Sequence, residues 1–204
     1  MLFDQNDPTA IDVLRVYLQH ARANGRKIGL TSGSFDLIHY HHVLYFTRCS
    51  RYCDVLIVGV DSDELVRERK GEGRPVIYDS RRVAMVDAIK PVTFAFILNS
   101  VEDFGAMAKI VVPDVIFRSD AFLGHENEIL GRSFAKEIRI IRDVVEHSST
   151  TEIVEQAAKL ATTIKGKPEK CPETHAQQRT GLFATLSGVL RRQKRWNIQR
   201  ILPW

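Results

Sequence analysis

The spacing of apolar residues along the chain alternates between a helical period and short continuous runs. Helical spacing first appears over residues 9–24 and predicts an opening helix within residues 1–26. A continuous and largely β-branched run over 54–61 is typical of a strand that is buried on both faces of a parallel sheet. The alternation of such runs with helical segments predicts an α/β fold.

Further apolar runs are spaced so that helical stretches fall between successive strands. The additional predicted strands are 27–31, 93–98, 114–118 and 138–141, and the later predicted helices are 39–52, 80–90, 101–110, 126–136 and 149–163. Strands that are joined by helices run parallel, with right-handed crossovers. We therefore expect a doubly wound, Rossmann-like parallel sheet.

The pattern breaks after residue 164, and the charge balance changes with it. Residues 165–172 are rich in Lys, Gly and Pro and are typical of a linker, and the apolar positions beyond them predict a short amphipathic helix. Residues 165–204 contain nine Lys and Arg and two Glu, whereas residues 1–164 contain 20 Lys and Arg and 23 Asp and Glu. We expect a main domain at 1–164, followed by a linker and a basic helical tail at 165–204.

Several roles fit such a tail. It could contact an anionic membrane surface or an acidic partner, or it could be a packing helix in a homo-oligomer. Nucleic-acid binding is not expected, because the positive charge is confined to the tail and is not interleaved with several aromatic residues.

The composition describes an ordinary globular protein. The chain has 204 residues, of which 44% are hydrophobic and 26% charged, enough for one sizeable α/β core. It shows no signal-peptide pattern and no apolar run long enough to cross a bilayer, so we expect a cytoplasmic location. Cys49, Cys53 and Cys171 form no paired CxxC motifs, which favours reduced thiols over a disulfide framework or a structural zinc site.

The segment from Gly33 to His42 carries the most chemistry. Ligands of open α/β sheets bind beyond the carboxyl ends of the strands, where a helix N-terminus favours anions. Gly33 would let the backbone approach a phosphate, and His39 and His42 would share one helix face. Two other interpretations remain open. The histidines could be solvated or structurally satisfied, or they could bind zinc together with His41, although no Cys or Glu completes a ligand spacing.

Four ordered segments resemble the cytidylyltransferase-like superfamily. The opening motif of that superfamily resembles Thr31-Ser32-Gly33-Ser34-Phe35-Asp36-Leu37-Ile38-His39. The middle segment of its sugar-phosphate nucleotidyltransferases, most closely those that adenylylate heptose 1-phosphate, resembles Lys70-Gly71-Glu72-Gly73-Arg74-Pro75 with Arg82. A later strand and the closing helix start of that group resemble residues 113–116 and 149–153. The likeness implies the HIGH-type nucleotidyltransferase fold.

The resemblance also implies an activity. In such enzymes a substrate phosphate attacks the α-phosphorus of a nucleoside triphosphate, here ATP or CTP, and pyrophosphate leaves. The acceptor would be a phosphorylated sugar or polyol. Mg²⁺ would accompany the triphosphate, bound mainly by phosphate oxygens and water, so no dedicated protein metal site is expected.

Residue roles follow from the same resemblance. The catalytic residues would be His39 and His42, and the acceptor substrate would contact Asp36 and Arg118. The residues that bind the nucleotide and its phosphates would be Ser32, Gly33, Ser34, Phe35, Lys70, Arg82, Ser149, Thr150 and Thr151.

Three places depart from the family pattern. His41 stands where the HxGH motif has glycine, and His147 stands close to the Ser-Thr-Thr run where glycine is usual. Residues 118–122, Arg-Ser-Asp-Ala-Phe, replace Lys-Gly-Gly-Asp-Tyr. These departures predict either a shifted substrate or a nucleotide-binding regulatory or scaffold protein that no longer turns over. Two added imidazoles would also make phosphate binding depend on pH.

Overall fold

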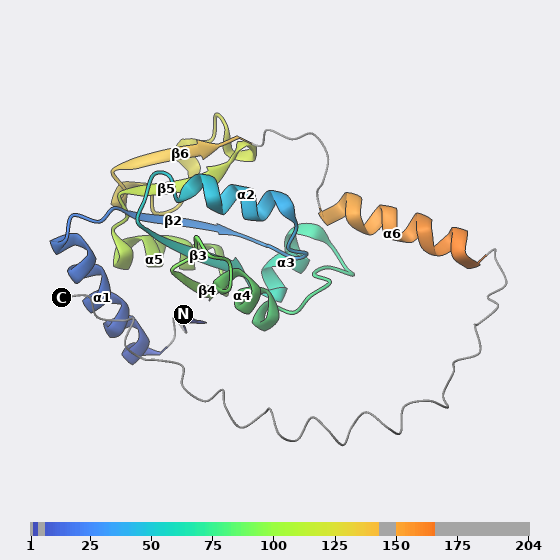
Figure 1. Cartoon of the computed structure of the whole chain (residues 1–204), viewed down its shortest axis with the longest axis horizontal. Coiled ribbons are helices and arrows are strands. Elements are labelled where there is room, and N and C mark those ends of the chain that lie inside the picture. The colour runs from blue at the N-terminus through green and yellow to red at the C-terminus, as the bar shows by residue number, and fades with distance from the viewer. Residues whose placement is uncertain (1, 4–6, 143–149, 166–204) are drawn as a thin grey trace, which may run out of the picture. The chain divides into compact units, whose positions relative to one another are not determined.

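The computed structural model describes residues 2–3, 7–142 and 150–165 of the chain. The chain divides into two compact units, Met1–Leu160 and Ala161–Trp204, and the first contains every strand that is described. Its six strands form one parallel sheet in the order β1-β4-β3-β2-β5-β6 (Figure 1). The strands are β1 (Leu2–Phe3), β2 (Ile28–Gly33), β3 (Val55–Asp61), β4 (Phe94–Leu98), β5 (Val115–Ser119) and β6 (Glu137–Ile141).

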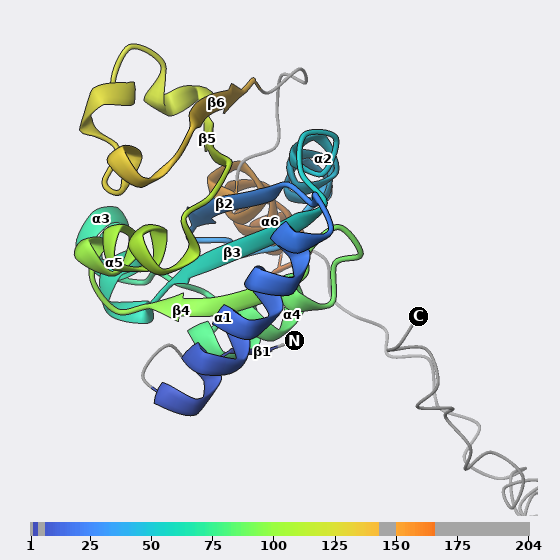
Figure 2. The same cartoon turned by 90° about the vertical axis from the view of Figure 1, so that its left-hand side faces the viewer.

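Helices cover both faces of this sheet, as the sequence predicts. The covering helices are α1 (Pro8–Ala23), α2 (Tyr40–Cys49), α3 (Asp63–Lys70), α4 (Asp79–Asp87) and α5 (Val101–Val111). A sixth described helix, α6 (Thr150–Lys165), follows them in the chain. One hydrophobic core lies between the sheet and α1 and α5, and a second lies between the sheet and α2 and α4 (Figures 1 and 2).

Strand β3 shows why its sequence is apolar without alternation. Successive side chains point to opposite faces of a strand. Ile57 accordingly enters the core beneath α1 and α5, whereas Leu56 and Val58 enter the core beneath α2 and α4. Both faces of β3 are therefore buried, and the predicted doubly wound parallel sheet is confirmed.

The order of the strands reverses at β2. This strand pairs with β3 on one side and with β5 on the other. A crevice opens at the carboxyl ends of the strands at such a point, and α/β proteins place ligands there. The turn after Gly33, which connects β2 to α2, lies at this position.

Two elements differ from the sequence-based expectation. Helix α3 was not predicted, because only Leu65 and Val66 supply apolar side chains to its buried face. Capping is the signal that could have found it, since Ser62 Oγ accepts a hydrogen bond from the Leu65 amide at 3.3 Å. Strand β1 was not predicted either, because two residues are too few for a periodic pattern.

The predicted helix at 126–136 is wrong. This segment contains two short 3₁₀ turns, at 126–128 and 132–134. Gly131 between them has a φ of +79°, and a Cβ on it would lie 2.4 Å from Ala108 Cβ. The close approach to α5 requires glycine in a left-handed conformation, which interrupts a continuous helix.

The end of the chain is described only in part. Helix α6 starts at Thr150, in agreement with the predicted helix start. The predicted linker and amphipathic helix lie, except for residue 165, outside the described residues. No helix among the described residues is long and apolar enough to cross a membrane.

Candidate active site

The turn after β2 is built around the Phe35 ring. Phe35 has a φ of +44° and is buried, with its ring 5.0 Å from that of Phe46 and 5.3 Å from that of His42. A Cβ on Gly33 would lie 3.0 Å from Phe35 Cζ. The glycine therefore makes room for a ring that supports one of the predicted catalytic histidines.

The two predicted catalytic histidines lie together at the start of α2. His39 occupies the N-cap position, and its backbone amide donates to His42 Nδ1 at 3.4 Å. The two ring centroids are 3.9 Å apart, and the His41 ring lies 5.7 Å from that of His39. Three imidazoles thus gather at a helix N-terminus, where the partial positive charge of the helix favours anions.

The electrostatic environment of these rings repels further positive charge. The pKa of His42 is lowered to about 3, first by burial and then by the neighbouring His39, Lys70 and His41 in that order of importance. His42 is consequently neutral near pH 7. Burial also lowers the pKa of Lys70, with the nearby Arg74 as the next cause. A bound anion would relieve the repulsion within this cluster.

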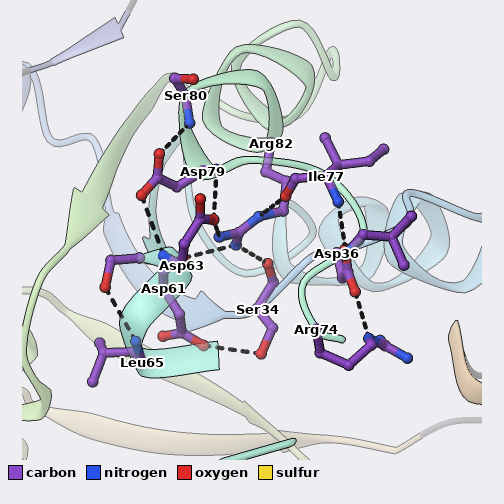
Figure 3. Close-up of polar contacts among 12 residues, drawn as sticks. Ser34, Asp36, Asp61, Asp63, Leu65, Arg74, Ile77, Asp79, Ser80 and Arg82 are labelled. Carbon is purple, nitrogen blue, oxygen red and sulfur yellow. Dashed lines mark hydrogen bonds and ion pairs between the residues drawn. The ribbon is translucent and has the colours of Figure 1, made fainter. Parts of the chain in front are cut away.

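Asp36 supports the loop between α3 and α4. It is 1% exposed, and its Oδ1 accepts hydrogen bonds from the amides of Val76 at 2.8 Å and Ile77 at 3.1 Å (Figure 3). Its Oδ2 pairs with Arg74 Nε at 2.7 Å. The predicted direct contact with the acceptor does not fit this burial. We correct that role to one of loop positioning.

Arg82 is fully buried, and its donors are used within the protein (Figure 3). Nη1 donates to the carbonyls of Ser34 at 2.5 Å and Asp61 at 2.7 Å. Nε donates to the Ile77 carbonyl at 2.8 Å, and Nη2 pairs with Asp63 at 2.8 Å. The predicted contact between Arg82 and phosphate is corrected in the same way, because this guanidinium ties the turn after β2 to the segments around it.

The carboxylates near the turn already have partners. Ser34 Oγ donates to Asp61 Oδ2 at 3.1 Å, and Asp61 also pairs with Arg69. Asp63 pairs with Arg82. Within the described ranges, no group of three or more His, Cys, Asp or Glu residues is arranged to hold a metal ion.

The predicted residues Ser32 and Arg118 meet at the crevice between β2 and β5. Arg118 Nη1 donates to Ser32 Oγ at 2.6 Å. Thr150 and Thr151 are the first residues of α6, whereas Ser149 and His147 lie outside the described residues. The predicted roles of Ser149, Thr150 and Thr151 therefore stay predictions.

Sequence reasoning missed two residues that shape the site. Arg74 lies in the motif that carries the family resemblance, and its pairing with Asp36 depends on a contact across 38 positions in the sequence. Phe104 packs against the Arg118 guanidinium, which lies 3.9 Å from its ring centroid. Its helical periodicity indicates a core position and carries no signal of this contact.

Comparison with known proteins agrees with this geometry. The family model described as cytidylyltransferase-like matches residues 30–156. The bifunctional protein HldE of a Nitratiruptor species is 37% identical over 132 residues, which make up 65% of this chain and 28% of the relative. HldE of Desulfatibacillum aliphaticivorans is 37% identical over 144 residues, 67% of this chain and 28% of the relative.

A solved structure is also similar to this chain. The lipopolysaccharide core biosynthesis protein from Thermoplasma volcanium is 22% identical, with a TM-score of 0.49 over 60% of this chain and all of that chain. The family model covers more than half of the present sequence, including the histidine turn and its supporting loop. The chain belongs to the cytidylyltransferase-like family of nucleotidyltransferases.

Proposed function

We propose that the protein transfers a nucleotidyl group from ATP or CTP to a phosphorylated sugar or polyol and releases pyrophosphate. The observation that carries this proposal is the cluster of His39, His42 and Lys70 at the carboxyl end of β2, next to the start of α2. The match to the cytidylyltransferase-like family supports the reaction class. The chain aligns with only 28% of each HldE relative, so the substrates of this chain are part of our proposal and are not taken from those relatives.

The reaction needs charge stabilisation more than a covalent intermediate. A phosphate oxygen of the acceptor forms a bond to the α-phosphorus, the bond to the β-phosphate oxygen breaks, and pyrophosphate carries away the released charge. His39 and His42 would donate hydrogen bonds to phosphoryl oxygens, and Lys70 would add positive charge. Ser149, Thr150 and Thr151 would hold the triphosphate at the start of α6.

The buried network holds these groups in place. Asp36 fixes the loop that follows Lys70, and Arg82 fixes the backbone at Ser34. Alignment of two reactants for in-line attack is sensitive to small displacements of the groups that bind them. Asp36 and Arg82 would therefore act on the rate through the geometry of the turn, without touching the substrates.

Mg²⁺ would be held mainly by the triphosphate. Asp61 and Asp63, which lie near the turn, are already paired with Arg69 and Arg82. Mg²⁺ commonly keeps several waters and binds phosphate oxygens, so it needs few ligands from the protein. The ion would neutralise phosphate charge when bound.

Pyrophosphate release tests the proposal. The full chain is mixed with Mg²⁺, with ATP or CTP, and with a panel of phosphorylated sugars and polyols, and compared with His39→Ala and the control His20→Ala, which alters an exposed histidine of α1. We expect release with at least one pair of substrates, loss in His39→Ala and no loss in the control. No release with any pair would contradict the proposal.

His41 supports a second candidate function, that of a nucleotide-binding regulatory or scaffold protein. An imidazole here occupies space beside His39 where the family motif has glycine. A site narrowed in this way could bind a nucleotide without turnover. Thermal stabilisation by ATP or CTP, together with absent pyrophosphate release that returns in His41→Gly, would favour this function.

A further inference from the structure

A cavity of about 240 Å³ opens at the amino ends of β2, β3, β5 and β6, which are neighbours in the sheet. Lys27 and Asp54 line it directly before β2 and β3. Val115 and Glu137, the first residues of β5 and β6, line it as well. The histidine turn follows the carboxyl end of β2, so this cavity lies at the opposite end of the strands.

Helix α2 separates the cavity from the histidines (Figure 1). His39 is the N-cap of this helix, and Ser50, which lines the cavity, is its C-cap. The helix has ten residues and therefore rises by about 15 Å from one end to the other. A small ligand in the cavity would lie too far away to touch a reactant bound at the histidine turn.

The charges that line the cavity leave positive charge without a partner. The cations are Lys27, Arg51 and Arg139, and the carboxylates are Asp54 and Glu137. Asp54 Oδ2 accepts a hydrogen bond from the backbone amide of Lys27 at 2.8 Å, and Glu137 Oε1 accepts one from Arg139 Nε at 2.6 Å. Within residues 2–3, 7–142 and 150–165, neither Lys27 Nζ nor the Arg51 guanidinium forms an ion pair. These two groups remain available to an anion.

Arg139 is held in place on an aromatic ring. Its central guanidinium carbon lies 3.8 Å from the ring centroid of Tyr52, which also lines the cavity. The Tyr52 ring lies 6.5 Å from the ring of Phe117, a fully buried residue of β5. A guanidinium stacked on a ring keeps N–H groups around its edge for other contacts. Because the fork is already oriented, less conformational freedom would be lost when it binds a ligand.

The carboxyl end of α2 opposes an anion only weakly here. Such an end carries about half an elementary negative charge, which is less than the full charge of either Arg51 or Arg139. The carbonyls of Phe46, Arg48 and Cys49 also accept hydrogen bonds from the amides of the three residues after the helix, at 3.0, 3.2 and 3.0 Å. These carbonyls are therefore satisfied and need no donor from a ligand.

The size of the cavity favours a small ligand. One water needs about 10–15 Å³ of such volume, whereas pockets for drug-sized ligands span about 300–1,000 Å³. A phosphate with a few adjoining atoms fits between these limits. Guanidinium groups match phosphate oxygens with two parallel hydrogen bonds, and a Lys ammonium adds a compact positive charge.

We propose that this cavity is a second anion site, which binds the phosphate group of a small molecule through Lys27, Arg51 and Arg139. The site is separate from the histidine turn and does not depend on the reaction assigned to that turn. Its ligand is either free inorganic phosphate or a small phosphate ester, since the same three cations would hold the phosphate of both.

Titration with inorganic phosphate at constant ionic strength is the first test, followed by the amide NMR signals of the full chain with and without ATP or CTP. We expect the amides of Tyr52 and Cys53 to shift as phosphate is added, whether or not the nucleotide is present. Shifts confined to residues 33–42, or shifts at Tyr52 and Cys53 that the nucleotide abolishes, would overturn the proposal. A parallel titration with methyl phosphate distinguishes the sources, since the ester should bind more tightly only if the natural ligand is an ester.

Arg51→Gln and Lys27→Gln are the second test, with Arg15→Gln as the matched control. All three side chains are exposed, and Arg15 belongs to α1 and does not line the cavity. We expect phosphate to bind about fivefold or more weakly in each of the first two variants, because a charge-assisted contact is lost, and with unaltered affinity in the control. Equal affinities in all three variants would overturn the proposal.

The outcomes separate this site from the proposed function. Phosphate binding that depends on Arg51, without pyrophosphate release for any substrate pair, would keep the anion site and reject the enzyme. Pyrophosphate release by a protein whose Tyr52 and Cys53 amides do not respond to phosphate would keep the enzyme and reject the anion site.

Discussion

The imidazoles at the start of α2 and the guanidinium of Arg82 lie near the same turn, and they differ in how their polar atoms are used. The centroids of the His39 and His42 rings lie 3.9 Å apart, with an angle of 33° between the ring planes, and Lys70 lies close enough to lower the pKa of His42. Arg82 is fully buried and bonded to three carbonyls and one carboxylate (Figure 3). In the proposed function the first region binds a ligand from outside, whereas the donors of the second are used within the protein.

In the proposed function this difference separates the groups that bind substrate from the groups that position them. A motif contains both kinds, because each is needed for the site to form. Arg82 and Lys70 are both cations in segments that resemble the same family, yet Lys70 keeps an exposed surface and Arg82 has none. Substitutions in the two regions should therefore affect different measurements, activity in the first and stability in the second.

The largest effect is expected at Arg82. Arg82→Gln would remove the guanidinium partner of the Asp63 carboxylate and of the Ser34 carbonyl, at a cost of about 3–5 kcal/mol in the free energy of unfolding. Urea denaturation would measure this loss. Arg81→Gln is the control, because Arg81 is the exposed neighbour on α4. Equal stability of the two variants would show that the buried network does not brace the fold.

His39→Ala should lower activity strongly and stability only slightly. Removal of one donor to the transition state costs on the order of 100-fold in kcat, while an exchange at the partly exposed start of α2 should change stability by about 1 kcal/mol or less. Pyrophosphate release and urea denaturation of the same preparation would measure both. If His39→Ala lost as much stability to urea as Arg82→Gln, the distinction between the two regions would be contradicted.

The effect of pH on stability should be smaller and should come from His42. The pKa of His42 is about 3 in the folded protein and 6.5 in its ordinary state. The unfolded chain therefore takes up a proton that the folded protein does not, and stability falls as the pH falls from 6.5 towards 3. Above that range this contribution is constant. In His42→Gln, denaturation midpoints should fall less steeply as the pH is lowered from about 6.5 to about 4.5, with His20→Gln as the control.

The smallest effect is expected at His41. His41→Gly restores the residue of the family motif and removes one imidazole from the cluster. We expect triphosphate affinity to change by about a few-fold, because the exchange removes one ring beside His39 at the helix N-terminus. Calorimetric titration with ATP or CTP would measure the change. An unaltered affinity would show that His41 takes no part in triphosphate binding.

Much of the fold could be predicted from local patterns. The buried run of β3 and the glycine turn before α2 carry their own signals, so the sheet and the position of the histidines follow from the sequence. The helix expected at 126–136 failed because Gly131 is required by a contact with Ala108, which is distant in sequence.

The roles of the charged residues were harder to predict for the same reason. Asp36 binds amides 40 and 41 positions away, and Arg82 binds a carbonyl 48 positions away. No local spacing reveals which of two cations will be enclosed by such contacts. Arg118 is also largely buried, and its predicted contact with the acceptor comes from the family resemblance and not from local spacing.

The most direct test of the different roles is the single-turnover rate of pyrophosphate release by His39→Ala at a temperature where it and the wild-type protein are both fully folded. The account predicts a rate on the order of 100-fold below that of the wild-type protein, since it assigns the lost donor to the transition state of the reacting phosphates. A rate equal to that of the wild-type protein would contradict it.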